Sequence, residues 1–180
     1  MHRRLLLTAA AGLALPAAAS AQAPQLDPEN TLYMDLKDGR VVIQMLPQIA
    51  PNHVARIKEL VRKGFYDNTP FHRVIDGFMA QGGDPTGTGR GGSGSNIKAE
   101  FTRSRKFIRG TVGAARAQSP DSADSQFFIC FAPAPNLDGQ YTIWGQVVQG
   151  MEFVDRIKRG EPPAVPDRIV RVRVAADVKS

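Results

Sequence analysis

Residues 71–83 read FHRVIDGFMAQGG, which places two short apolar runs on either side of the dipeptide Asp76-Gly77. Asp-Gly between apolar runs is typical of a tight turn, so this segment is expected to form a β-hairpin. The next segment, GGDPTGTGRGGSG at residues 82–94, is too rich in glycine for a helix or an interior strand. It lacks the Gly-Lys-Ser/Thr ending of a phosphate-binding loop, so we expect a wide surface loop.

Further extended runs separated by turns lie on both sides of this hairpin. Upstream, residues 31–46 contain two apolar runs around Asp38-Gly39, which indicates another hairpin. Downstream, residues 168–178 alternate apolar and charged side chains, as a half-buried strand does. Many short strands with few helices favour a mostly-β chain, and a closed antiparallel barrel in particular. The remaining runs are FIRGTVGA, QFFICF and YTIWGQVV, at residues 107–114, 126–131 and 141–148.

Two segments have a helical pattern. From Pro51 to Gly64, apolar residues recur at helical spacing and charged residues cover the other side. Proline suits a first helical turn and glycine a C-terminal cap, so both ends of this helix are marked. A second, shorter helix is expected over Met151–Lys158, and the two helices would cap the barrel.

The N-terminus has the layout of a secretory signal peptide. Arg3 and Arg4 precede an apolar run over residues 5–19, and small residues mark a cleavage site after Ala21. The run is too short to cross a bilayer as a helix, so we expect an exported, soluble protein. A membrane anchor is the alternative, but no cysteine follows the run to carry a lipid. The paired arginines leave both the general and the twin-arginine export routes open.

The predicted domain organisation is a signal peptide at residues 1–21, a flexible lead at 22–30 and one folded domain at 31–180. The net charge is +6, but the basic residues are scattered without interleaved aromatic residues, so no nucleic-acid partner is expected. Cys130 is the only cysteine, which excludes an intramolecular disulfide, and its apolar neighbours predict a buried, unreactive thiol. We expect a monomer with no stable membrane insertion.

The chain offers few groups for hydrolytic or metal chemistry. After the signal peptide its histidines are His53 and His72, and neither has another metal ligand four residues away. His72 lies in an apolar run and is expected to be a hydrogen-bonded structural residue. No nucleophile-elbow pattern is present, so a hydrolase would lack its nucleophile, base and orienting group. No metal or organic cofactor is expected. Arg73 remains, and alone it would be interpreted as a surface or ion-paired residue.

Five blocks follow one another along the chain: FHRVIDGFMAQGGDPTGTGRGG at 71–92, IKAEF at 97–101, RGTVGAARA at 109–117, SQFFI at 125–129 and LDGQYTIWGQVVQGMEFVDRI at 137–157. In sequence and in order they resemble the cyclophilin family of prolyl isomerases. The resemblance covers residues 31–178 and implies an eight-stranded antiparallel closed β-barrel capped by two α-helices. It also implies peptidyl-prolyl cis-trans isomerase activity, which assists protein folding and needs no cofactor.

The resemblance implies a site with Arg73 as the catalytic arginine. Gln81 would hydrogen-bond the substrate backbone, and the backbone of Ala115 and Arg116 would hold the extended part of the peptide. Tyr141 occupies a position where many relatives have histidine. The apolar pocket for the substrate proline ring would be formed by Phe78, Met79, Phe128 and Leu137. Asn136 stands where some relatives carry a tryptophan important for binding cyclosporin, so cyclosporin binding does not follow from the resemblance.

The hairpin at Asp76-Gly77 sets a geometric condition on this site. An ideal two-residue turn there would put Arg73 and Phe78 on one face of the hairpin and Gln81 on the other. All three could then serve one site only if a bulge or a strong twist intervened.

The expected substrates are proline-containing unfolded or flexible polypeptides, and the expected location is the periplasm. A prolyl isomerase breaks no covalent bond and only stabilises the twisted amide. The alternative is a non-enzymatic chaperone or adaptor that holds proline-bearing segments in the same groove. The joint presence of Arg73, Phe78, Gln81 and Phe128 argues against that alternative.

Overall fold

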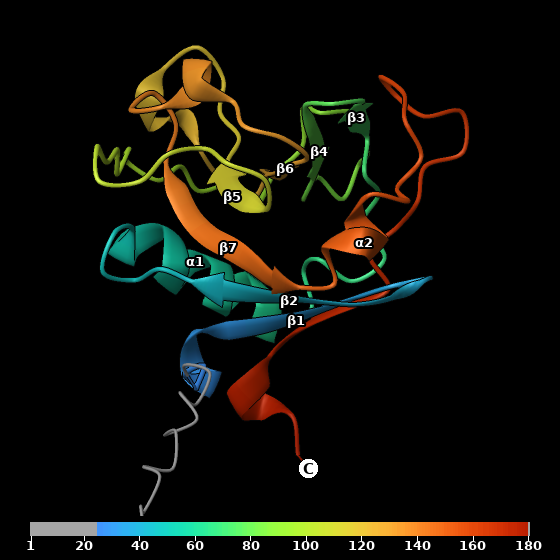
Figure 1. Cartoon of the computed structure of the whole chain (residues 1–180), viewed down its shortest axis with the longest axis horizontal. Helices are drawn as coiled ribbons and strands as arrows, with labels where there is room; N and C mark the ends of the chain where they lie inside the picture. Colours follow the sequence, from blue (N-terminus) through green and yellow to red (C-terminus); the bar gives the residue numbers. More distant parts are fainter. Residues whose placement is uncertain (1–24, 180) are drawn as a thin grey trace, which may run out of the picture.

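The computed structural model describes residues 25–179, so the predicted signal peptide and the first residues of the predicted lead lie outside it. One curled sheet of eight antiparallel strands dominates, in the order β3-β4-β6-β5-β7-β2-β1-β8 (Figure 1). The strands are β1 (Thr31–Leu36), β2 (Gly39–Met45), β3 (Arg73–Ile75), β4 (Met79–Gly82), β5 (Thr111–Ala114), β6 (Phe127–Cys130), β7 (Ile143–Gln149) and β8 (Arg171–Val174). The helices are α1 (Pro51–Arg62) and α2 (Met151–Val154), with 3-10 turns η1 (Pro28–Asn30), η2 (Pro120–Ser122), η3 (Pro135–Leu137) and η4 (Ala175–Asp177).

The first hairpin and α1 form where the sequence predicts them. Strands β1 and β2 pair up to Leu36 and Gly39, around a tight turn. Pro51 opens α1, and Gly64 follows its end in the left-handed conformation at φ 68°. Helix α2 ends at Val154, four residues before the predicted end at Lys158, because the N–H groups of Arg156 and Ile157 bond to carbonyls three residues back instead of four.

The prediction of a closed barrel is too strong, because β3 and β8 are the two edges of the sheet and do not pair. The segments before these strands approach each other instead. The N–H of Asn68 donates to Ile169 O at 2.8 Å, and the N–H of Phe71 donates to Asp167 O at 2.9 Å. A regular ladder cannot continue here, since Pro70 lacks an N–H and Asn68 has a positive φ of 60°. The sheet is therefore a half-barrel whose open side is held by a few backbone bonds.

The two faces of the sheet support two separate apolar clusters. Along β6, Phe127 and Ile129 point into the main core, which lies inside the curled sheet and includes the apolar side of α1. Phe128 and Cys130 point to the outer face, where they join a second cluster with residues such as Met79. Because this outer cluster is covered only in part, it can form the floor of a surface site.

Helix α1 takes its N-terminal cap from a distant part of the chain, since Ala50 offers no side-chain acceptor. The carboxylate of Glu100 accepts the backbone N–H groups of Asn52 and His53, each at 3.0 Å. It also contacts the His53 Nδ1 at 2.6 Å. These bonds satisfy donors that are otherwise free in the first turn of a helix and place a negative charge at its positive end.

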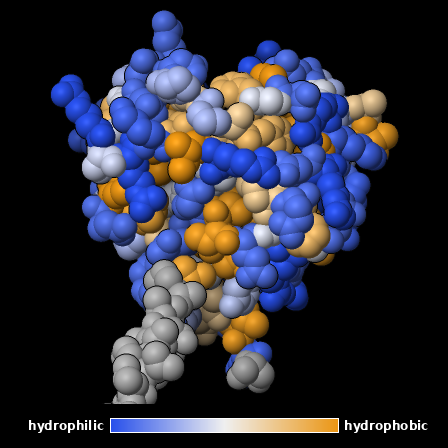
Figure 2. Space-filling view, in the orientation of Figure 1, coloured by the Kyte–Doolittle hydropathy of each residue, from blue (hydrophilic) through white to orange (hydrophobic). Residues whose placement is uncertain are grey.

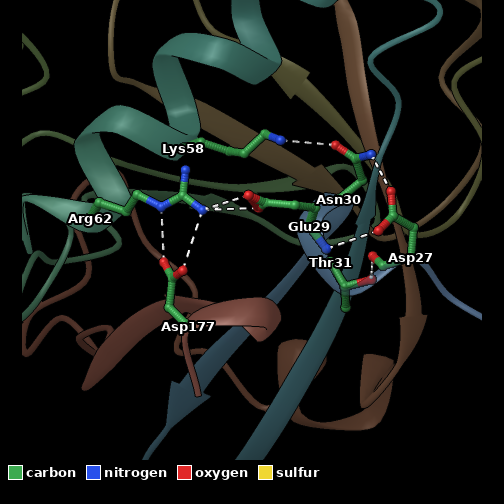
Figure 3. Close-up of polar contacts among 7 residues, drawn as sticks. All are labelled: Asp27, Glu29, Asn30, Thr31, Lys58, Arg62 and Asp177. Atoms are coloured by element: carbon green, nitrogen blue, oxygen red, sulfur yellow. Dashed lines mark hydrogen bonds and ion pairs between the residues drawn. The ribbon is translucent and has the colours of Figure 1, made fainter. Parts of the chain in front are cut away.

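Arg62, at the other end of α1, joins both ends of the domain (Figure 3). Its guanidinium donates to Glu29 of η1 at 2.9 Å and to Asp177 of η4 at 2.9 Å. Lys58 of the same helix donates to Asn30 Oδ1 at 3.1 Å. Residues 28–30 of the predicted lead thus form a 3-10 turn bonded to the polar face of α1.

Figure 2 shows one face on which apolar patches near the centre are separated and surrounded by hydrophilic side chains. Between residues 25 and 179 no helix combines the length and apolar character needed to cross a membrane.

Candidate active site

A groove of about 730 Å³ lies on the outer face of the sheet, above the second apolar cluster. Segments distant in the sequence meet there: the β3–β4 hairpin, the residues after β5, strand β6 and the η3 region. Its lining includes every residue that the sequence assigns to the site, namely Arg73, Phe78, Met79, Gln81, Ala115, Arg116, Phe128, Leu137 and Tyr141, together with Asn136. The structure therefore brings the predicted set together, while their individual roles stay predictions.

The β3–β4 turn is one residue longer than an ideal two-residue hairpin. Ile75 pairs with Met79, so the turn contains three residues, with Gly77 in the left-handed conformation at φ 66°. Consequently Arg73 lies directly opposite Gln81 on the same face of the hairpin. The ideal two-residue turn that would separate these side chains is therefore not formed, and Arg73 and Gln81 both line the groove, as the resemblance implies. The carbonyl of Phe78 accepts the N–H of Phe131 at 2.8 Å, and this contact with the end of β6 holds Phe78 in the turn.

Phe128 forms the apolar floor of the groove. Its ring stacks on Phe107 with centroids 5.6 Å apart and meets the edge of Tyr141 at 5.9 Å. This packing depends on Gly113 in the neighbouring strand, where an added Cβ would lie 2.6 Å from the Phe128 Cζ. Met79 and Leu137 complete the floor and are also buried.

The side chain of Arg116 fixes one wall of the groove, a feature that the sequence did not predict. Its guanidinium donates to Gln140 O at 2.9 Å and to the carbonyls of Ala117 and Gln118 at 3.0 Å. It also lies over the Tyr141 ring, 4.5 Å from the centroid. The segment after β5 is therefore bound to the segment after η3, and the groove between them keeps its width.

A chain of amides links the floor to the glycine-rich loop. Gln81 donates to the Gln126 Oε1 at 3.0 Å, and Gln126 donates to Gly89 O at 3.0 Å and Gly91 O at 2.8 Å. Asp84 organises the loop from inside. Burial raises the pKa of Asp84, but hydrogen bonds from the Thr86 hydroxyl and from backbone N–H groups outweigh this effect and lower it to about 2.

Arg73 stands at the open rim of the groove, with 46 % of its side chain exposed. Its Nε donates to Glu161 Oε1 at 2.8 Å. Among the residues that the structure describes, neither Nη nitrogen has a hydrogen-bond partner. A guanidinium in this state can donate its Nη hydrogens to a bound peptide.

The remaining reactive side chains are buried. His72 is 6 % exposed, and its ring nitrogens have no hydrogen-bond partner within residues 25–179, so the predicted hydrogen bonding is not observed. Burial lowers the pKa of His72, which favours the neutral ring. Cys130 is fully buried, as predicted, and burial raises the pKa of its thiol to about 12. In the described part of the chain, no group of three or more possible metal ligands gathers.

Among the residues that sequence reasoning did not assign to this site, Gly113, Gln126 and Glu161 make contacts with those that it did assign. Gln126 directly precedes the apolar run of β6 and could have been selected as the single polar residue there. Gly113 and Glu161 carry no local signal, because their importance depends on side chains from other parts of the chain.

Comparison with known proteins identifies the class. Residues 31–174 match the family described as "Cyclophilin type peptidyl-prolyl cis-trans isomerase/CLD". A probable peptidyl-prolyl cis-trans isomerase of Brucella suis is 49% identical over 193 residues, covering 98% of both chains. The peptidyl-prolyl cis-trans isomerase of Helicobacter pylori is 40% identical over 137 residues, covering 73% of this chain and 83% of its own.

Solved structures of cyclophilins have the same fold as this chain. The cyclophilin AquaCyp293 of Hirschia baltica superimposes with a TM-score of 0.79 at 30% identity, over 86% of this chain and 77% of its own. A Cryptosporidium parvum cyclophilin, crystallised in the presence of the dipeptide Ala-Pro, gives a TM-score of 0.75 at 30% identity, over 80% and 98% of the two chains. The chain belongs to the cyclophilin-type peptidyl-prolyl cis-trans isomerase family. The predicted family and enzyme class are confirmed.

Proposed function

We propose that the groove catalyses rotation about X-Pro peptide bonds, with Arg73 as the hydrogen-bond donor to the proline nitrogen. The observation that carries this proposal is the placement of Arg73 opposite Gln81 at the rim of an apolar floor. The Ala-Pro dipeptide used with the Cryptosporidium parvum neighbour is consistent with a small proline-containing ligand.

The reaction needs electrostatic help and no bond cleavage. The C–N bond of a peptide has partial double-bond character and a rotation barrier of about 18–20 kcal/mol. In the twisted state the proline nitrogen becomes pyramidal and regains a lone pair. A guanidinium N–H can meet that lone pair with a charge-assisted hydrogen bond, which is absent in either planar ground state. Arg73 is suited to this task because its Nη nitrogens remain available.

The other residues would position the substrate. The ring of proline would rest on the floor formed by Phe78, Met79, Phe128 and Leu137. Gln81 and the backbone at Ala115 and Arg116 would hold the peptide on either side of the ring, and Tyr141 would close the end of the floor. Accelerating an uncatalysed exchange of roughly 100 s to milliseconds requires about 10⁵-fold, or roughly 7 kcal/mol, to be shared among these groups.

The test is Arg73→Ala in the purified protein, assayed by coupled isomerisation of a proline-containing peptide. We expect kcat/KM to fall at least tenfold while the thermal unfolding curve stays unchanged, since the side chain is half exposed. Arg105→Ala, which removes an exposed arginine outside the groove, is the matched control and should retain full activity. Undiminished activity of Arg73→Ala would refute the role. Binding of the peptide without turnover by the wild type would instead support the alternative of a non-enzymatic binder.

We propose further that the protein is exported to the periplasm and acts there as a monomer on unfolded or flexible proline-containing polypeptides. The support is the arrangement of Arg3, Arg4, the apolar run and the small residues before position 22. Fractionation of the source cells, followed by mass determination of the N-terminus, tests the location and the cleavage after Ala21. Light scattering of the purified protein tests the monomer.

A further inference from the structure

The rim of the groove carries one acidic side chain directly on the proposed catalytic arginine. Glu161 and Pro162 line the groove, and Glu161 Oε1 accepts the Arg73 Nε at 2.8 Å. Through this pair the segment between α2 and β8 provides an acceptor to the guanidinium. The two side chains are about half exposed, so the pair faces solvent and any bound peptide.

The backbone that carries Glu161 is fixed to the strand that carries Arg73. Gly160 and Val74 exchange both of their backbone hydrogen bonds, each at 2.8 Å. These residues immediately precede Glu161 and follow Arg73, so the two charged side chains leave the backbone side by side. Glycine at position 160 allows the backbone of Pro163 to pack closely against it, because a Cβ there would lie 2.4 Å from the Pro163 Cα.

The far end of the same loop is also held. Asp167 O accepts the N–H of Phe71 at 2.9 Å, and its carboxylate accepts Lys37 Nζ at 2.7 Å and the N–H of Lys158 at 2.9 Å. Between these anchors the prolines restrict the backbone further. Glu161 is therefore presented by a loop tied down on both sides.

Glu161 accepts from the Nε of Arg73 and not from its Nη groups, and this difference determines how the pair can affect substrate binding. A guanidinium on a long, flexible and half-exposed side chain has many orientations open to it. An acceptor on Nε restricts the orientation of the group, while within residues 25–179 both Nη groups remain without a partner and can donate. Another carboxylate placed on the Nη edge would compete with the substrate, whereas the observed contact leaves that edge available.

We infer that Glu161 is a positioning residue: it holds Arg73 through Nε so that the Nη edge faces the peptide in the groove. The inference rests on the catalytic role proposed for Arg73. Its effect belongs to the transition state, since the proline nitrogen accepts a hydrogen bond only when the amide is twisted. Loss of Glu161 should therefore reduce kcat more than it changes KM.

Three variants test the inference: Glu161→Ala, Glu161→Gln and Glu161→Lys. We expect Glu161→Ala to lower kcat/KM three- to tenfold with KM within twofold of the wild type, measured by exchange spectroscopy of a proline peptide. Glu161→Gln keeps an oxygen acceptor for Nε and should recover activity to within twofold of the wild type. Glu161→Lys places a positive charge beside Arg73 and should lose at least tenfold.

A direct readout comes from the NMR signal of the Arg73 Nε–H, assigned by its absence in Arg73→Ala. Its order parameter should fall in Glu161→Ala and be retained in Glu161→Gln. Glu59→Ala is the matched control, because Glu59 is a similarly exposed carboxylate paired with Arg56 and Lys63 on α1, away from the groove. It should change neither the Arg73 signal nor the activity.

The outcomes separate the two claims. If Arg73→Ala loses activity while Glu161→Ala and Glu161→Lys keep it or gain it, the positioning role is overturned and the catalytic role stands. Glu161→Ala is also measured in the Arg73→Ala background. If it lowers activity there by the same factor as in the wild type, Glu161 does not act through Arg73, and the inference is again overturned. Full activity of Arg73→Ala would overturn the catalytic role and the positioning role together.

Discussion

Replacing Gly113 by alanine should damage the groove through a single methyl group. The added Cβ would lie 2.6 Å from the Phe128 Cζ and 2.8 Å from the Phe107 Cε1, and ordinary contacts are 3.4–4 Å. One or both rings must therefore move by roughly 1 Å. Both rings belong to the outer-face cluster, but Phe107 is 1% exposed and does not line the groove, whereas Phe128 does, so Phe128 is the ring with room to move. Overpacking of this kind costs about 1–3 kcal/mol of unfolding free energy.

The displaced ring would rise into the space proposed for proline. A misplacement of about 1 Å can reduce a rate by up to about 10²-fold, so we expect kcat/KM to fall between tenfold and a hundredfold. The assay is coupled isomerisation, with urea unfolding to correct for the folded fraction. Gly145→Ala is the matched control, because Gly145 pairs with Val112 beside Gly113 but its Cβ would meet Ile43 at 3.0 Å, in the main core and not in the groove. It should lower stability without lowering the activity per folded molecule. Wild-type activity in Gly113→Ala would refute the reasoning.

Two further predictions concern the partly buried carboxyl of Glu100 and the buried thiol of Cys130. Burial raises the pKa of Glu100, but hydrogen bonds from Asn52 and His53 outweigh it and hold the pKa below the ordinary 4.5. A carboxyl with a lowered folded pKa stabilises the fold above its unfolded pKa and loses that contribution as the pH falls through the folded value. The unfolding free energy, measured by urea titration, should therefore fall more steeply below pH 4.5 in the wild type than in Glu100→Gln; parallel curves would contradict this. Cys130, with its pKa raised to about 12, should react with a thiol reagent at neutral pH only after unfolding, and rapid labelling of the folded protein would exclude the packing described.

Elements encoded by neighbouring residues could be predicted from the sequence. The first hairpin follows from Asp38-Gly39, and α1 follows from Pro51 and Gly64, because turn and cap preferences act over a few residues. The gap between β3 and β8 could not be predicted in this way. It results from Pro70 and Asn68 meeting the chain near Ile169, and no local pattern indicates which distant segments meet.

The site shows the same limit. The family resemblance identified the residues that line the groove, but the face of β6 on which Phe128 lies could not be deduced, since QFFICF is apolar on both faces. Phe78, the extra residue in the β3–β4 turn, accepts the N–H of Phe131 just after β6, and no local pattern in residues 71–83 indicates that distant contact. Glu161 was missed for the same reason, because it lies in the loop between α2 and β8 while its partner Arg73 lies in β3.

The Arg62 contacts have a practical consequence for handling this protein. They bring η1 and η4 to the same end of α1, and Figure 1 shows the C-terminus on the opposite side of the molecule from β3, β4 and β6. A linker to a bead, a sensor surface or a partner enzyme could therefore be attached at the C-terminus, leaving the groove facing outward. An immobilised protein of this kind would keep its groove accessible to unfolded polypeptides that diffuse to it from solution.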